Sequence, residues 1–297
     1  MTKIRSRDSS QIEDRRGQGG GGGMGFPFPG GGGGGGMGFP TKAGGGLIGL
    51  LLLLASIFLP KLLGGASQAV STGDGQATSN TGRCESELEQ ILCGATNDVQ
   101  AFWTQMYPQA FDGQAYTPTK TVFFSGATDT GCGQATSQVG PFYCPLDGKI
   151  FFDLDFLVQL QEQFGATGDL AAQYIVAHEY GHHIQNLVGT SETVRDLQTR
   201  DPERANQYSV ALELQADCYA GTWAFDADRR GMFEQGEVVN EAINAAEAVG
   251  DDRIQQRTQG RVDPEDWTHG SAEQRASWFR AGFETGDPNT CDTFAEL

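Results

Sequence analysis

Basic residues are scarce in this chain of 297 residues. Lysine and arginine number 20 against 38 aspartates and glutamates, which gives a formal net charge of -18. The positions up to Leu63 carry seven basic and three acidic residues, so the whole excess of acid follows them. An acidic globular part repels phosphate backbones, and we therefore expect no nucleic-acid partner.

The chain also lacks the C-x-x-C spacing that thiolate metal sites use. An even number of cysteines without that spacing favours disulfides, with buried free thiols as the alternative. The sequence cannot settle the pairing, but closeness in the chain favours Cys84–Cys93 and Cys132–Cys144. This choice leaves Cys218 to pair with Cys291.

Long apolar runs are almost absent, with Leu47–Leu59 as the exception. The glycine-dominated tract before it cannot bury enough apolar surface to offset its conformational entropy, so we predict a disordered segment at 1–43. The apolar run can be extended to about 20 residues, no A-x-A cleavage site follows it, and basic residues precede it. We predict a transmembrane signal anchor at 44–65, with a cleaved signal or a buried helix as the alternatives.

This anchor implies a single-pass protein of the cytoplasmic membrane. The basic residues on its N-terminal side predict a cytoplasmic N-terminus, which places the acidic domain in the periplasm or outside the cell. A small, polar linker at 66–81 leads to that domain, which we assign to 82–297.

The domain is predicted to be α+β, predominantly helical with a small sheet. Two short runs rich in Val, Ile, Phe and Thr predict strands at Thr119–Phe124 and Gly148–Phe152. Apolar residues at helical spacing, together with capping residues, predict helices at about 85–111, 154–164, 170–187, 201–226, 237–249 and 271–283.

Histidine, a common metal ligand, is also scarce: the chain has only four. Two of them, His178 and His182, enclose Glu179 in an H-E-x-x-H pattern. On a helix, positions four apart share a face, so the two imidazoles converge on one point and predict a Zn²⁺ site. A structural zinc site needs no carboxylate beside it, so Glu179 favours a catalytic site in which it is the general base.

Two histidines do not complete a catalytic zinc site, and Glu213 is the strongest candidate for the third ligand. It shares a helix face with Asp217, four positions later, and both lie among apolar residues. We expect Glu213 to bind the metal and Asp217 to accept the free ring N–H of a metal-bound histidine. A solvated acidic face is the alternative.

The remaining histidines have weaker assignments. His269 precedes a predicted helix start and is a candidate catalytic residue that stabilises a developing oxyanion, in competition with Tyr180, Tyr208 and Tyr219. His183 lies off the metal face of its helix, so we expect it to have a packing or supporting role.

These residues together resemble the bacterial putative neutral zinc metallopeptidase family. The matching stretches are HEYGHHIQNLVG at 178–189, ELQADCYAGTWA at 213–224, GPFYCPLDGKIFFDLDF at 140–156 and HGSAEQRASWF at 269–279. The chain is also similar to gluzincins, in which H-E-x-x-H is joined by a glutamate from a second helix. The likeness implies a zincin-like fold, and it implies that Lys149–Asp153 is an edge strand that pairs with an extended substrate.

The sequence therefore predicts a membrane-anchored zinc metallopeptidase that acts on a peptide or protein substrate. The resemblance implies His178, His182 and Glu213 as ligands and Glu179 as the catalytic acid/base. Two alternatives stay open: a non-catalytic binding or scaffold protein with this fold, and a zinc hydrolase of another bond.

Overall fold

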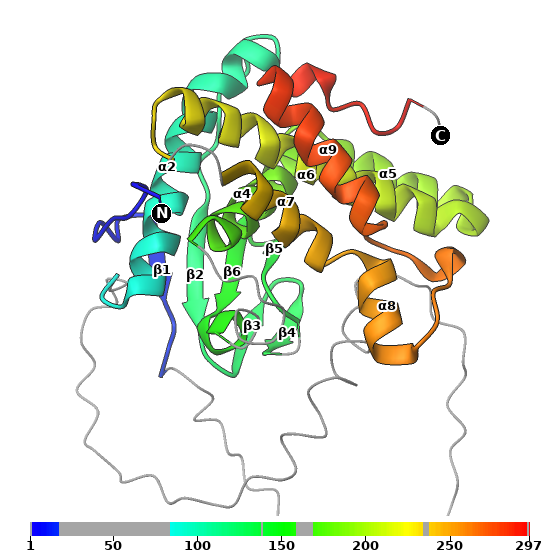
Figure 1. The fold of residues 1–297 in the computed structure, drawn as a ribbon, viewed down its shortest axis with the longest axis horizontal. Helices are drawn as coiled ribbons and strands as arrows, with labels where there is room; N and C mark the ends of the chain where they lie inside the picture. Colours follow the sequence, from blue (N-terminus) through cyan, green and yellow to red (C-terminus); the bar gives the residue numbers. More distant parts are fainter. Residues whose placement is uncertain (1, 18–83, 138, 159–168, 234–237, 296) are drawn as a thin grey trace, which may run out of the picture.

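The computed structural model describes residues 2–17, 84–137, 139–158, 169–233, 238–295 and 297 (Figure 1). Helices form most of this part of the chain, and the strands lie together at one side of the helical body (Figure 1). The predicted mixed α+β class with a helical majority is confirmed.

Four short strands form the main sheet, in the order β1-β2-β6-β5. The predicted strands appear as β2 (Lys120–Phe124) and β6 (Lys149–Asp153), which are parallel neighbours with buried aromatic residues. The other two are β1 (Ile12–Asp14), parallel to β2, and β5 (Phe142–Cys144), antiparallel to β6. Because β5 covers β6, the expectation that Lys149–Asp153 is an edge strand is wrong.

A separate hairpin of β3 (Ala127–Thr130) and β4 (Gly133–Thr136) follows β2. The disulfide Cys132–Cys144 fastens this hairpin to β5. The other two predicted pairs, Cys84–Cys93 and Cys218–Cys291, are also present as disulfides.

The helices follow the predicted pattern closely, because capping residues mark where some of them begin. A capping box on Ser86 and Glu89 begins α2, and a second on Ser271 and Gln274 begins α9. Two helices, α5 and α8, were not predicted from the sequence. Residues 154–158, before a break in the described ranges, are also helical. The other α-helices in the described ranges are α2 (Glu87–Ala110), α4 (Asp169–Leu187), α5 (Thr190–Arg200), α6 (Ala205–Arg229), α7 (Val238–Ala248), α8 (Asp251–Gln259) and α9 (Ala272–Thr285).

Glycines let the three central helices α4, α6 and α9 approach until their backbones touch. A Cβ atom added at Gly181 of α4 would lie 2.8 Å from the Ala216 Cα of α6. At the crossing of α6 and α9, a Cβ on Gly282 would lie 2.0 Å from the Cys218 carbonyl oxygen. Any larger residue would push the helices apart, so these glycines set the distance between the side chains that α4, α6 and α9 present to one another.

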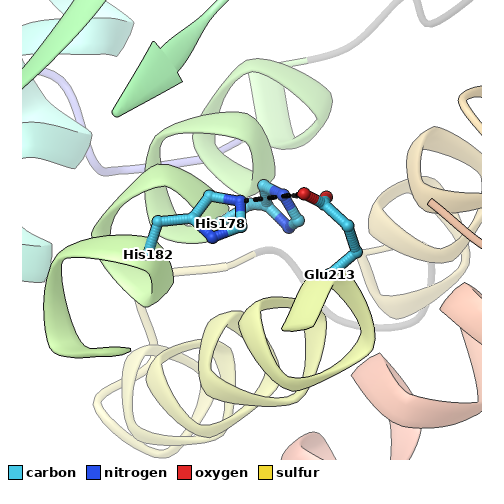
Figure 2. A group of neighbouring side chains, drawn as sticks. All are labelled: His178, His182 and Glu213. Atoms are coloured by element: carbon cyan, nitrogen blue, oxygen red, sulfur yellow. Dashed lines mark hydrogen bonds and ion pairs between the residues drawn. The ribbon is translucent and has the colours of Figure 1, made fainter. Parts of the chain in front are cut away.

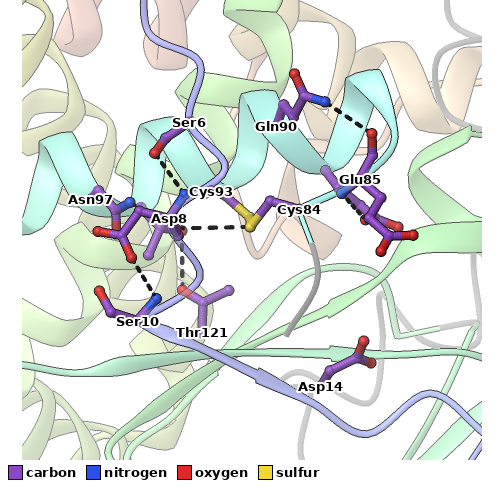
Figure 3. The surroundings of a disulfide bond; sticks show 12 residues. Ser6, Asp8, Ser10, Asp14, Cys84, Glu85, Gln90, Cys93, Asn97 and Thr121 are labelled. Atoms are coloured by element: carbon purple, nitrogen blue, oxygen red, sulfur yellow. Dashed lines mark hydrogen bonds between the residues drawn. A yellow bond between two sulfur atoms is a disulfide. The ribbon is translucent and has the colours of Figure 1, made fainter. Parts of the chain in front are cut away.

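Residues 2–17, which we call the N-terminal arm, fold onto the domain instead of lying free. Ile4 and Ile12 are buried in the core, and β1 extends the sheet. The buried Gln173 side chain donates a hydrogen bond to the Ile4 carbonyl (3.0 Å). The arm passes α2 beside the Cys84–Cys93 disulfide, where Asn97 donates to the Asp8 carbonyl (Figure 3). The disorder predicted for residues 1–43 is therefore wrong for the arm.

The predicted membrane topology needs the same correction. Among the helices in the described ranges, none combines the length and the apolar character that a membrane crossing requires. The predicted anchor (44–65) and linker (66–81) lie outside the described residues. Since the arm and the domain are in contact, one crossing between residues 17 and 84 would separate them. The predicted arrangement, with a cytoplasmic N-terminus and a domain outside, is therefore wrong.

Candidate metal centre

Helix α4 carries the H-E-x-x-H pattern through the middle of the molecule. It contacts α2, α6 and α7 as well as the sheet, so nearly every face of it is buried. His178 and His182 lie one turn apart, and their ring centroids are 4.7 Å from each other. The predicted helix therefore presents both imidazoles at one point.

Glu213, on the neighbouring helix α6, reaches both imidazoles (Figure 2). Its Oε2 lies 3.2 Å from Nε2 of His178, and its Oε1 lies 3.4 Å from Nε2 of His182. The ligand atoms of the three residues lie within 4.8 Å of one another, and in the described part of the chain this is the group that could hold a metal ion. We call it the metal cluster.

The donor set of the metal cluster fits zinc. Two imidazole nitrogens and one carboxylate oxygen match the three protein ligands of catalytic zinc sites. Ligands about 2.0–2.2 Å from a tetrahedral ion lie roughly 3.3–3.5 Å from each other. The two distances from Glu213 are close to that value. Bound zinc would still have one open coordination position for a water or a substrate.

Outside the metal cluster, Asp217 accepts a hydrogen bond from Nδ1 of His178 (2.8 Å), as the sequence spacing predicts. Asp217 is fully buried and pairs with Arg275 of α9 through two contacts of 2.8 and 3.0 Å. The Tyr174 hydroxyl donates to the same carboxylate at 2.5 Å. Arg275 and Tyr174 were not predicted as part of the site, because neither belongs to a metal-binding pattern.

The charges of these groups set their pKa values. Burial would raise the pKa of Asp217, but Arg275 and His178 outweigh burial and hold it below its ordinary value. For Glu213 the same opposition, with His182 and His269 as the main charges, leaves the pKa well below 4.5. Both carboxylates are therefore ionised at neutral pH, which a metal site requires.

His182 has a different outer partner. Its Nδ1 lies 2.8 Å from the side-chain oxygen of Gln185, one turn further along α4. Gln185 is fully buried and is also bonded to α6. The two histidines of the cluster are thus held by chemically different groups.

Glu179 lies beside the metal cluster and is buried, yet one of its carboxylate oxygens has no hydrogen-bond partner in the described structure. Burial raises its pKa above 4.5, although the nearby His182 and His178 oppose that rise. A buried acceptor without a partner is costly in an ordinary core. It is, however, what a general base needs before its substrate water arrives.

His269 lies just before α9, and its backbone and its ring both contact the carboxylate of Asp251 on α8. The Asp251 carboxylate lies 3.3 Å from Nδ1 of His269 and accepts backbone N–H bonds from Thr268, His269 and Gly270. Thr268 Oγ1 also lies 2.8 Å from Nδ1, so Nε2 is the nitrogen left for other contacts. His269 is close enough to Glu213 for its charge to lower that residue's pKa.

Tyr180, Tyr219 and His183 have their contacts in other parts of the fold. The Tyr180 hydroxyl donates to the Thr96 carbonyl of α2, and Tyr219 packs edge-on against Trp103 of the same helix. Nδ1 of His183 lies 3.1 Å from the Tyr143 hydroxyl and its Nε2 donates to the Thr117 carbonyl. Burial lowers the pKa of His183 to about 4, so it is neutral and links α4 to β5.

Comparison with known proteins agrees with the chemistry of this cluster. The family profile described as Putative neutral zinc metallopeptidase matches residues 1–294. The chain belongs to this family. The match includes the N-terminal arm as well as the domain. No solved structure matches the chain.

Two relatives show how widely the sequence is shared. The uncharacterized protein YpfJ of Escherichia coli strain K12 is 40% identical over 294 residues, which cover 98% of this chain and 97% of YpfJ. The uncharacterized protein Rv2575 of Mycobacterium tuberculosis strain H37Rv is 45% identical over 237 residues, covering 76% of this chain and 78% of Rv2575. Their names state no substrate.

Proposed function

We propose that this member of the family is a zinc-dependent peptidase that hydrolyses peptide bonds in a peptide or protein substrate. The observation that carries the proposal is the unpartnered, buried oxygen of Glu179 next to a cluster of two imidazoles and a carboxylate. A carboxylate oxygen that no protein donor occupies, beside three candidate metal ligands, is placed to accept a proton from a metal-bound water.

In this proposal His178, His182 and Glu213 hold the ion. Bound zinc supplies a Lewis acid that polarises the scissile carbonyl and makes a bound water easier to deprotonate. Glu179 takes the proton from that water and returns it to the departing amine. Its raised pKa brings it nearer to neutral pH, where a base and an acid can alternate.

His269 is proposed as the donor to the oxyanion that develops on the substrate. In the tautomer in which Nδ1 accepts from the Thr268 hydroxyl at 2.8 Å, Nε2 carries the ring proton and is the donor in this proposal. A donor held by fixed partners costs little reorganisation during the reaction. Asp251 has a positioning role here, since it contacts His269 and not the substrate.

The test compares wild type with Glu179→Gln in zinc content and in hydrolysis of an unfolded polypeptide. We expect the variant to keep one zinc per chain and to lose about 10²–10⁴-fold in rate, the usual contribution of a general base. Glu192→Gln, an exposed residue of α5 with the same change in charge, is the control and should hydrolyse like wild type.

A Glu213→Ala variant checks the ligand set in the same preparation and should lose zinc. Full activity in Glu179→Gln would reject this residue as the base. Zinc binding by wild type without hydrolysis of any peptide would favour the non-catalytic alternative instead.

A further inference from the structure

His178 and His182 are equivalent in the H-E-x-x-H pattern, but their outer nitrogens meet different groups. Nδ1 of His178 meets the carboxylate of Asp217, as in many zinc sites. Nδ1 of His182 meets the neutral side chain of Gln185 at 2.8 Å. Gln185 itself lies outside the H-E-x-x-H pattern.

The contacts of Gln185 determine which way its amide faces. Its Nε2 lies 2.6 Å from the Leu212 carbonyl and 3.2 Å from Oε1 of Gln215, and both of these atoms only accept hydrogen bonds. The amide nitrogen must therefore face α6, and the amide oxygen must face His182. An oxygen there can accept only from a protonated Nδ1.

This orientation selects the tautomer of His182. With the proton on Nδ1, the neutral ring has its lone pair on Nε2, which faces Glu213 at 3.4 Å and the centre of the metal cluster. The opposite tautomer would place an N–H in the metal position and leave the Gln185 oxygen without a donor. Metal binding needs the first tautomer.

Gln185 is in turn held from the far end of the chain. The Gln215 side chain, which accepts from Gln185, donates to the Cys291 carbonyl at 2.9 Å. The Cys218–Cys291 disulfide fixes that carbonyl against α6, because Cys218 is the residue after Asp217 on that helix. A chain of amide groups therefore runs from the C-terminal tail to the outer nitrogen of His182.

We propose that Gln185 is the positioning residue that prepares His182 for zinc, with Gln215 and the Cys291 carbonyl holding Gln185 in place. This inference rests on the proposed zinc site and deepens it. The role of Gln185 is to hold the imidazole in one rotamer and one tautomer, so that zinc does not have to select them from a mixture.

A second buried glutamine on the same helix provides a matched control. Gln173 is also fully buried, and its Nε2 donates to one carbonyl, that of Ile4 in the N-terminal arm. It lies more than two helical turns before His182 and contacts neither histidine of the metal cluster. Replacing either glutamine removes a buried amide hydrogen bond, but only Gln185 holds a metal ligand.

The experiment measures zinc affinity by competition with a chromophoric chelator in wild type, Gln185→Met, Gln185→Glu and Gln173→Met. Methionine preserves the shape and removes the acceptor, so we expect Gln185→Met to bind zinc about 10–100-fold more weakly. Glutamate keeps an oxygen for Nδ1–H but loses the N–H donors to the Leu212 carbonyl and Gln215 Oε1, so Gln185→Glu should be less stable than wild type and yet bind zinc more tightly than Gln185→Met.

Urea unfolding of the metal-free proteins separates positioning from folding. Both methionine variants should be less stable than wild type, whereas only Gln185→Met should lose zinc affinity. The absorption spectrum of the Co²⁺-loaded protein gives a second readout, because a misplaced imidazole changes the coordination geometry and hence the spectrum. Equal zinc affinities for Gln185→Met and Gln173→Met would overturn the inference.

If Gln185→Met does not fold, Gln215→Met replaces it, since this variant removes only the remote support of Gln185. A several-fold loss of zinc affinity would support the positioning chain, and an unchanged affinity would reject it. Failure of the zinc site itself has a different result: wild type would not bind zinc at all.

Discussion

The two sides of the metal cluster are built from different chemistry. On the His178 side a buried carboxylate, Asp217, is balanced by the guanidinium of Arg275. On the His182 side the outer partner is the amide of Gln185, and the groups behind it are neutral. A carboxylate makes its histidine more basic, whereas an amide fixes the ring without adding a charge.

This difference between the two sides limits the number of buried charges around the candidate metal position. Glu213 and Asp217 already contribute two negative charges beside the site, and Arg275 returns one positive charge. Burial of each charge is costly unless a partner stays in place. We infer that the charged side depends on all its members at once, whereas the neutral side can lose one member more cheaply.

The largest expected effect comes from Asp217→Asn, which makes the charged side resemble the neutral one. The substitution keeps the shape but leaves Arg275 buried without its carboxylate. We expect a loss of about 3–5 kcal/mol in the free energy of unfolding of the metal-free protein. Zinc affinity should fall by about 10–100-fold. Urea denaturation and chelator competition measure the two effects.

Asp226→Asn is the control on the same helix, because its carboxylate pairs with Arg230 in a largely exposed ion pair. Its effect on stability should stay below about 1 kcal/mol. Adding Arg275→Met to Asp217→Asn should restore part of the lost stability, since the orphaned charge is then gone. Equal stability of Asp217→Asn and Asp226→Asn would show that the charge of Asp217 is unimportant.

Most of the metal cluster was predictable because its signals are local. The spacing of His178, Glu179 and His182 places them on one helix, and Glu213 with Asp217 repeats that spacing on a second. The two capping boxes and the strands rich in Phe are local in the same sense. The sequence does not encode the crossing of α4 and α6 so directly, although Gly181 is what permits it.

The features that the sequence did not predict depend on contacts between residues far apart in the chain. The arm joins the sheet through a strand of three residues, β1, whose partner begins more than 100 positions later. Two isolated isoleucines in a polar stretch do not predict such a strand. Arg275 lies within the family-like stretch at 269–279, but nothing local shows that a basic residue there is buried. Gln185, three positions after His182, was predictable in principle from helical spacing.

A smaller loss of stability is expected when the replaced carboxylate is that of Asp251, which accepts from backbone N–H groups, than when it is that of Asp217, which pairs with Arg275. Burial would raise the pKa of Asp251, but its bonds to His269 and to the backbone outweigh burial and keep the pKa below 3.8. A lowered pKa stabilises the fold above the unfolded-state pKa, and that stability is lost as the pH falls through the folded-state pKa.

Asp251→Asn should therefore be less stable than wild type by about 1–3 kcal/mol at pH 7. The difference should shrink below about pH 4 and vanish as wild-type Asp251 becomes protonated. Thermal or urea unfolding of the metal-free proteins from pH 7 to pH 2 checks the curve. Asp196→Asn, an exposed residue of α5, should show no such change. A gap that stays constant down to pH 2 would mean that charge contributes nothing there.

The smallest effect is expected from Tyr174→Phe, which removes a neutral partner from the charged side. Asp217 keeps Arg275 and His178, so the loss of stability should be about 1 kcal/mol, and zinc affinity should change by less than about threefold. Tyr180→Phe is the control, because its hydroxyl is also buried on α4 but bonds with the Thr96 carbonyl and the Thr121 side chain, away from Asp217. A drop in zinc affinity as large as that of Asp217→Asn would show that the tyrosine hydroxyl, and not the ion pair, orients the carboxylate toward His178.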